Sequence, residues 1–250
     1  QTADAFLLRA FWDPQMRRDR KSATNYCLEV SRQQILDNSL EKLVKVQQVG
    51  GKDPLKLPLR VEFSGEPGID MGGVAKEYFS LVVKELFNPL LGMFKVNEDV
   101  QLYWFNGATF EPNVNFELVG TLMGLAIYNN LFIDLPLAHA CYKLLLDQTP
   151  DLDDLAQYQP EAAKSLRFIA EYEDHEKCPL EDMLCRSFTV DVERFGVTEE
   201  VELCPGGRDM VVNRFNRGEF IRLYIEWEFC RQCEGELAAF KKGFERMVDK

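Results

Sequence analysis

The stretch Leu57-Pro-Leu-Arg-Val-Glu-Phe-Ser-Gly-Glu-Pro-Gly-Ile-Asp-Met-Gly-Gly-Val-Ala-Lys-Glu-Tyr-Phe79 carries more structural information than any other part of this chain. Its first half alternates apolar and charged residues over 59–63, which predicts a half-buried strand. Glycines and a proline over 65–68 predict a turn. Asp70 is then placed to cap the N-terminus of a helix over 74–87. The stretch therefore predicts a strand, a glycine-rich turn and a helix, in that order.

This glycine-rich turn has two interpretations from its residues alone. A turn between a strand and a helix N-terminus can bind a phosphate. However, the spacing of these glycines fits neither the dinucleotide fingerprint nor the P-loop, and the carboxylates of Glu66 and Asp70 would repel an anion. The other interpretation is a corner at which glycine lets the strand and the helix pack closely, and we favour it.

Composition and charge restrict the class of protein. Of the 250 residues 46% are hydrophobic and 28% charged, which is typical of a globular protein with one large or two unequal domains. A net charge of −12 argues against a nucleic-acid partner and favours a partner with a basic surface. The longest apolar run, residues 118–128, is too short to span a membrane. We interpret Gly120 and Gly124 within it as a point of close helix packing in a core.

The cysteines and histidines suggest no metal and no cofactor. Seven cysteines spread over a large chain are not typical of a disulfide framework, and they indicate a reducing compartment, the cytosol or the nucleus. Cys230 and Cys233 have the spacing of half a zinc or redox site within an expected helix. No second pair lies at metal spacing, and the chain has only two histidines, His139 and His175. We therefore expect no metal site.

Hydrophobic periodicity predicts an α+β fold that is mainly helical. Helices are expected over residues 32–46, 74–87, 113–130, 136–146, 160–172 and from 213 onward, and short strands near 28–30, 59–63, 93–94, 102–105 and 187–190. Pro205-Gly206-Gly207 is interpreted as a hairpin turn. Asn213 is expected to cap the final helix, with a weak point at Gly235.

Several blocks of the sequence, in chain order, resemble the HECT-type ubiquitin ligase domain. The first is Phe63 to Val74, followed by Lys76, Glu77 and Phe79. Similar blocks follow at 88–94, 103–106, 116–134, 171–173 and 216–224. The resemblance implies the N-terminal lobe of that domain. Residues 1–149, completed by 221–250, would form a large helical subdomain, and residues 150–220 a small inserted α+β subdomain.

The resemblance implies an activity that this chain cannot complete alone. HECT ligases form a thioester between ubiquitin and one cysteine, and then transfer ubiquitin to a substrate lysine. A thiolate suits this chemistry because it is both a strong nucleophile and a good leaving group. In the family that cysteine lies in a C-terminal lobe, and none of the seven cysteines here matches its position. We expect a ubiquitin-protein transferase as the full-length protein and no catalytic residue in this chain.

The small subdomain is implied to bind a thioester-charged ubiquitin-conjugating enzyme through a hydrophobic groove that accepts a protruding aromatic residue. Carried over position by position, the groove residues are Ser165, Leu166, Tyr172, Leu184, Phe220 and Tyr224. Tyr224 lies one helical turn after Phe220, so the two side chains can form one wall. The other interpretation makes all six core residues, because groove and core have the same composition. Ubiquitin and protein substrates are further implied partners, with substrates bound outside this chain.

Two other hypotheses for the function stay open at this point. One is a regulatory or scaffold module of the same fold without transferase activity. The other is a phosphate- or metal-dependent enzyme, which would be stabilised against heat by its ligand. From the residues alone no catalytic constellation is evident, because carboxylate pairs such as Glu171 and Glu173 are typical of a solvated face.

Overall fold

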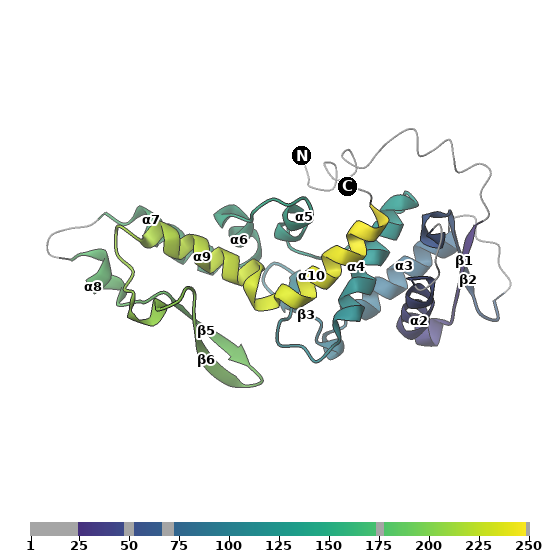
Figure 1. Ribbon diagram of the computed structural model, residues 1–250, viewed down its shortest axis with the longest axis horizontal. Coiled ribbons are helices and arrows are strands. Elements are labelled where there is room, and N and C mark those ends of the chain that lie inside the picture. Colours follow the sequence, from purple (N-terminus) through teal and green to yellow (C-terminus); the bar gives the residue numbers. More distant parts are fainter. Residues whose placement is uncertain (1–24, 48–52, 67–72, 174–177, 249–250) are drawn as a thin grey trace. The chain divides into compact units, whose positions relative to one another are not determined.

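A computed structural model describes residues 25–47, 53–66, 73–173 and 178–248 (Figure 1). Helices make up most of this part of the chain, and its strands form three two-stranded sheets, β1-β2, β3-β4 and β5-β6. The predicted α+β, mainly helical class is therefore confirmed. The N-cap predicted at Asp70 lies outside the described residues. No helix in the described ranges is long and apolar enough to cross a membrane.

The chain divides into two compact units. Unit 1 comprises residues 1–94, 109–135 and 235–250, and unit 2 comprises residues 95–108 and 136–234. These bounds differ from those of the subdomains expected from the sequence, since residues 95–108 and 136–149 pack together with 150–220. The role of residues 150–220 in docking stays a prediction.

Unit 1 begins with two parallel strands joined through a helix. Its elements are β1 (Tyr26–Val30), η3 (Arg32–Gln34), α2 (Ile35–Gln47), η4 (Pro54–Lys56), β2 (Leu59–Phe63), α3 (Gly73–Leu86), η5 (Pro89–Leu91), α4 (Asn113–Tyr128) and nearly all of α10 (Glu234–Met247). β1 and β2 pair in register from Tyr26↔Leu59 to Val30↔Phe63. The Arg32 guanidinium lies 4.0 Å from the centroid of the Phe63 ring and covers the end of this sheet. The strand, helix and second strand of this region are confirmed as predicted.

The core of unit 1 is built around the crossing of α4 and α10. α4 is buried on nearly every side, as its uniformly apolar sequence predicts. A Cβ added at Gly120 would lie 1.9 Å from the carbonyl oxygen of Phe240, and one at Gly243 would lie 2.0 Å from that of Glu117. A Cβ at Gly124 would lie 2.5 Å from the Met247 Cβ and 3.2 Å from the Phe244 carbonyl oxygen. The two helices thus approach backbone to backbone, which confirms the predicted close packing at Gly120 and Gly124.

Unit 2 has its own aromatic core. Its elements are most of β3 (Phe94–Asn97), β4 (Leu102–Phe105), α5 (Ala140–Leu145), α6 (Leu152–Tyr158), α7 (Pro160–Glu171), α8 (Leu180–Leu184), β5 (Thr189–Arg194), β6 (Val197–Glu202), η6 (Gly207–Asp209), α9 (Arg217–Phe229) and η7 (Arg231–Cys233). The buried indole of Trp104 lies 4.9 Å from the Phe229 ring and 6.3 Å from the Tyr158 ring, between centroids. Strand β4 and helices α6 and α9 therefore share one core.

The helix predicted over 136–146 is shorter than expected. Pro136–Ala138 is extended, because Tyr103 donates its N–H to the Pro136 carbonyl at 2.7 Å and accepts from the Ala138 N–H at 3.1 Å. These backbone groups pair with β4, so the helix α5 begins only at Ala140. A contact distant in sequence overrides the local helical signal of Pro136.

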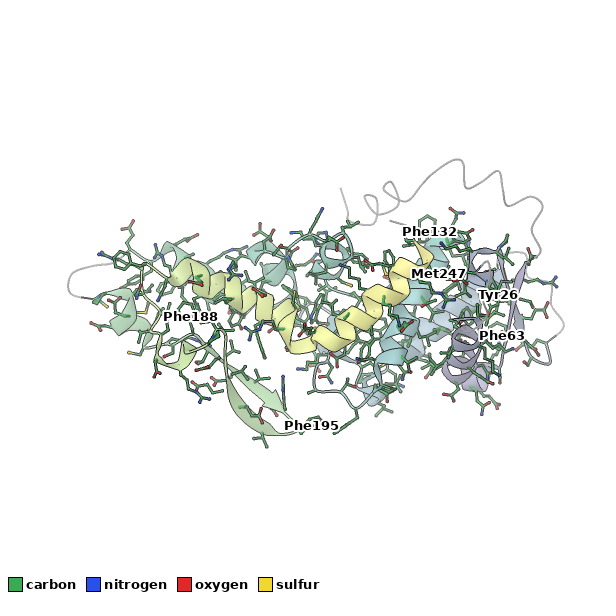
Figure 2. The ribbon with its side chains drawn as sticks, viewed as in Figure 1. Tyr26, Phe63, Phe132, Phe188, Phe195 and Met247 are labelled. Carbon is green, nitrogen blue, oxygen red and sulfur yellow. The ribbon has the colours of Figure 1, made fainter. Side chains whose placement is uncertain are left out.

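The hairpin turn predicted at Pro205-Gly206-Gly207 was wrong. The hairpin joins β5 to β6, and its two-residue turn is Phe195-Gly196, with φ of 52° and 78°. Positive φ at both positions matches the right-handed twist of the strands. Gly206 also has a positive φ, but it precedes the short helix η6 rather than closing two strands. Phe195 lies at the tip of the hairpin (Figure 2).

The final helix begins later and breaks earlier than predicted. Asn213 does not cap it: its side chain accepts from the N–H groups of Phe215 and Asn216, which forms a turn, and α9 begins at Arg217. α9 ends at Phe229. Cys230 precedes the 3-10 helix η7 and Cys233 is its last residue, so the two cysteines do not lie in a continuous helix. The break therefore precedes the expected weak point, Gly235, which lies in the first turn of α10.

Candidate docking surface on helices α7 and α9

Helix α7 presents a buried face and an exposed face at one end of unit 2. Pro160 occupies its first turn, where the missing N–H costs no helical hydrogen bond. Ala163, Leu166 and Ile169 form the buried stripe at helical spacing. Ser165 lies on the exposed side. The periodicity of this sequence thus fixes which side chains α7 can offer to a partner.

Helix α9 contributes aromatic rings that pack beneath this surface. Phe220 is only 1% exposed, and its ring meets the Phe188 ring edge-on at 5.4 Å between centroids. The Tyr224 ring lies 6.3 Å from the Phe220 ring, between centroids. The Arg186 guanidinium lies 5.9 Å from the centroid of the Phe220 ring. Phe220 therefore holds α9 and the residues before β5 together, and it supports Tyr224, which is half-buried.

One arginine joins the ends of α7 and α9. Arg217, the first residue of α9, donates from Nη1 to the carbonyl oxygens of Ile169 at 3.2 Å and Tyr172 at 2.6 Å. These are carbonyls at the C-terminal end of α7, where a cation is favoured by the helix dipole. The Tyr172 hydroxyl in turn donates to the Cys178 carbonyl at 3.0 Å, which ties the residues before α8 to the same corner.

The six residues predicted to line a groove differ in how much they expose. Leu166 is 4% exposed and Phe220 1% exposed, so neither can present much surface to a partner. Ser165 is exposed, and Tyr172, Leu184 and Tyr224 are half-buried. The structure brings Phe220 next to Tyr224 and ties Tyr172 to α9 through Arg217. Binding of a conjugating enzyme at these residues stays a prediction.

Sequence reasoning missed one side chain on this surface. Phe168 is 53% exposed, and its ring lies 5.6 Å from the Tyr172 ring in an edge-on arrangement. Phe168 follows Ser165 by three residues on α7, and Tyr172, the residue that ends the helix, packs against the Phe168 ring. This spacing was visible in the sequence and could have identified Phe168.

A half-buried glutamate, Glu228, lies one helical turn after Tyr224 on α9. Burial raises the pKa of Glu228, although its Oε1 accepts a hydrogen bond of 2.6 Å from Gln159 Nε2. Burial, and then the negative charge of Glu228, also raise the pKa of the Tyr224 hydroxyl. Both groups are therefore favoured in their neutral forms.

We expect a Glu228→Gln variant to melt at a higher temperature than the wild type at pH 7, and to lose this advantage at pH 4. The folded-state pKa of Glu228 is raised, so the stability it contributes is present below the unfolded pKa of about 4.3 and is lost as pH rises through the folded pKa. The glutamine keeps an acceptor for Gln159 and removes the charge. Melting curves of both proteins at pH 4, 5.5 and 7 check this, and a difference that does not change with pH would contradict it.

Three of the cysteines have thiols that burial disfavours as nucleophiles. Burial raises the pKa of the Cys27, Cys141 and Cys230 thiols, which disfavours the nucleophilic thiolate. Cys141 and Cys233 are buried. Across the described segments, no group of three or more histidine, cysteine or acidic side chains is arranged to hold a metal ion.

Comparison with known proteins identifies the family to which this chain is similar. A model of the HECT-domain (ubiquitin-transferase) family matches residues 80–250. The chain is 39% identical over 227 residues to the probable E3 ubiquitin-protein ligase HERC4 of Homo sapiens, which covers 90% of this chain and 21% of that protein. It is 36% identical over 231 residues to the probable E3 ubiquitin-protein ligase HECTD2 of Mus musculus, and the match covers 87% of this chain and 29% of that protein. It is 32% identical over 243 residues to the E3 ubiquitin-protein ligase NEDD4 of Mus musculus, and the match covers 95% of this chain and 26% of that protein. The chain thus spans about a fifth of the length of the HERC4 relatives.

Proposed function

Because this chain belongs to the HECT-domain (ubiquitin-transferase) family, we propose that it is the N-terminal lobe of a HECT-type ubiquitin ligase and binds a thioester-charged ubiquitin-conjugating enzyme. Ubiquitin then passes from the conjugating enzyme to a cysteine in a C-terminal lobe outside this chain, and from there to a substrate lysine. In the first transfer the ligase thiolate attacks the thioester, a new thioester forms and the cysteine of the conjugating enzyme leaves as a thiol. In the second the lysine amine attacks, an amide bond forms and the ligase cysteine leaves as a thiol.

The observation that carries this proposal is the corner at which α7, α8 and α9 meet. Arg217 ties the start of α9 to the end of α7, and the Tyr172 hydroxyl ties Cys178, just before α8, to the same corner. Tyr172 there and Tyr224, two turns along α9, are both half-buried. A half-exposed aromatic surface on a rigid support is typical of protein interfaces, in which tyrosine is enriched. We place the conjugating enzyme on residues Ser165, Leu166, Tyr172, Leu184, Phe220 and Tyr224, with the buried Leu166 and Phe220 as support.

The cysteine environments support a division of labour between this lobe and a second one. Three cysteines are poorly placed for nucleophilic chemistry, because burial raises the pKa of the Cys141 and Cys230 thiols and Cys233 is buried. A docking lobe needs no reactive thiol of its own. It needs only weak binding, because the conjugating enzyme must dissociate after it has lost its ubiquitin. Interfaces of such transient complexes are usually smaller than about 1,200 Å².

We expect the purified chain to bind at least one member of a panel of ubiquitin-conjugating enzymes in NMR titrations, and not to accelerate loss of ubiquitin from the thioester-charged form. A longer version of the protein that includes the residues after position 250 is the comparison for the discharge assay. Faster discharge by the chain alone would show a catalytic residue within it. Absence of binding across the panel would remove the docking role and leave a scaffold module.

A further inference from the structure

The exposed side of α7 carries one large apolar side chain that the proposed docking residues do not include. Phe168 is 53% exposed, whereas the apolar residues Leu166 and Ile169 on the opposite side are 4% and 6% exposed. Exposing a phenylalanine to water forgoes the free energy that its burial would supply. Single exposed apolar residues are common on protein surfaces, so exposure alone does not make Phe168 functional. Its position relative to its neighbours is what distinguishes it.

Phe168 belongs to a rigid aromatic pair. Its ring contacts Tyr172 edge-on at 5.6 Å, an arrangement that aromatic quadrupoles favour. Tyr172 is held at both ends, by the hydrogen bond from its hydroxyl to the Cys178 carbonyl and by the one that its own carbonyl accepts from Arg217. A partner that covers this pair therefore does not have to immobilise mobile side chains. The entropy cost of binding is smaller, which favours the complex.

From these observations we infer that Phe168 is a principal direct contact for the conjugating enzyme, an inference that rests on the proposed function above. Ser165 and Tyr172 share its side of α7, so an enzyme docked on them must also cover Phe168. Phe220 and Leu166 lie beneath the surface and act as positioning residues. The burial energy of docking comes from Phe168 and Tyr172 more than from Phe220.

The charges around the pair indicate the chemistry of the surface that fits it. Among the described residues at this end of unit 2, the exposed carboxylates are those of Glu161, Glu171, Glu173 and Asp182, and the exposed cations include Lys164 and Arg186. On the cationic side, Arg167 pairs with Asp153 at 2.8 Å, and Arg217 is occupied by backbone carbonyls. The conjugating enzyme should therefore present an apolar side chain to Phe168, and the surrounding rim should carry lysine and arginine.

The test is a titration of the 250-residue chain with the panel of uncharged conjugating enzymes, using the tightest binder as the probe. We expect Phe168→Ala to weaken binding by about fivefold to tenfold, because roughly half of a phenylalanine side chain is left to be buried by the enzyme. Its melting temperature should stay close to the wild-type value, since about half of the residue is already exposed to water. Phe195→Ala is the matched control, because Phe195 is 65% exposed in the same unit and lies at the hairpin tip.

The outcomes separate this inference from the proposed function. Binding that is weakened by Phe168→Ala and unaffected by Phe195→Ala supports the inference. Unchanged binding by Phe168→Ala, together with weakened binding by Tyr224→Ala, overturns it and leaves the docking role in place. Equal weakening by the two phenylalanine variants indicates a nonspecific apolar contact and also overturns it. If no enzyme in the panel binds the wild-type chain, the proposed function itself fails.

Discussion

A Gly120→Ala variant will be less stable than the wild type by at least about 3 kcal/mol, or will not fold. The added methyl group would lie 1.9 Å from the carbonyl oxygen of Phe240 and 2.9 Å from the Phe244 nitrogen. These are backbone atoms of α10, so the clash cannot be relieved by rotating a side chain. The two helices would have to separate, and the apolar contacts along α4 would be lost with them.

The matched control for this prediction is Gly218→Ala. Gly218 lies in the first turn of α9, and a Cβ there would meet no atom within 4 Å. Alanine is the better helix former by up to about 1 kcal/mol, so this variant should be as stable as the wild type or slightly more so. Urea titrations of both variants check the pair. Similar midpoints for the two would show that α4 and α10 do not approach as closely as described.

The second large effect is expected for Phe220→Ala, which should lose about 3–5 kcal/mol of stability and all detectable binding of a conjugating enzyme. The stability cost arises because the Phe220 ring is 1% exposed and packs edge-on against Phe188. Without it, a cavity would open beneath Tyr224 and the end of α9.

A second variant separates the loss of docking from the loss of stability. Phe220→Leu keeps most of the apolar volume and should cost less than about 1.5 kcal/mol, but it removes the ring that supports Tyr224. We expect this variant to melt cooperatively near the wild-type temperature and to bind about tenfold more weakly in calorimetry or NMR. Wild-type affinity for Phe220→Leu would exclude the phenyl ring from a positioning role.

The parts of the fold that the sequence predicted well are those determined by local pattern. Alternation over 59–63 marks β2, and the apolar sequence of α4 marks a buried helix. The Gly120 and Gly124 spacing could be interpreted physically, because small residues at i and i+4 leave one helix side open to a close neighbour. In each of these cases the sequence signal and the tertiary environment agree.

The errors lie where contacts distant in sequence decide the backbone conformation. Pairing with Tyr103 keeps Pro136–Ala138 extended. The residues next to Pro136 in the sequence do not predict this pairing. The hairpin turn falls at Phe195-Gly196, which lacks the usual Asn-Gly or Asp-Gly signal, while Pro205-Gly206-Gly207 has stronger turn residues and a different role.

The candidate site divides in the same way. Helical spacing correctly placed Phe220 next to Tyr224, since their rings lie 6.3 Å apart. Composition could not tell whether Leu166 and Phe220 line a surface or fill a core, and the structure buries both. The link from Arg217 to the carbonyls of α7 depends on tertiary structure, so no sequence pattern could have predicted it.

The interleaving of the two units limits how this protein can be dissected. Unit 2 is assembled from residues 95–108 and 136–234, so a fragment of residues 150–220 would omit both Trp104 and Phe229. Such a fragment would lack the centre of its own hydrophobic core, and a negative result from it in a pull-down would say nothing about docking. Anyone designing shorter pieces for crystallisation or labelling should leave the polypeptide whole and introduce point substitutions instead of deletions.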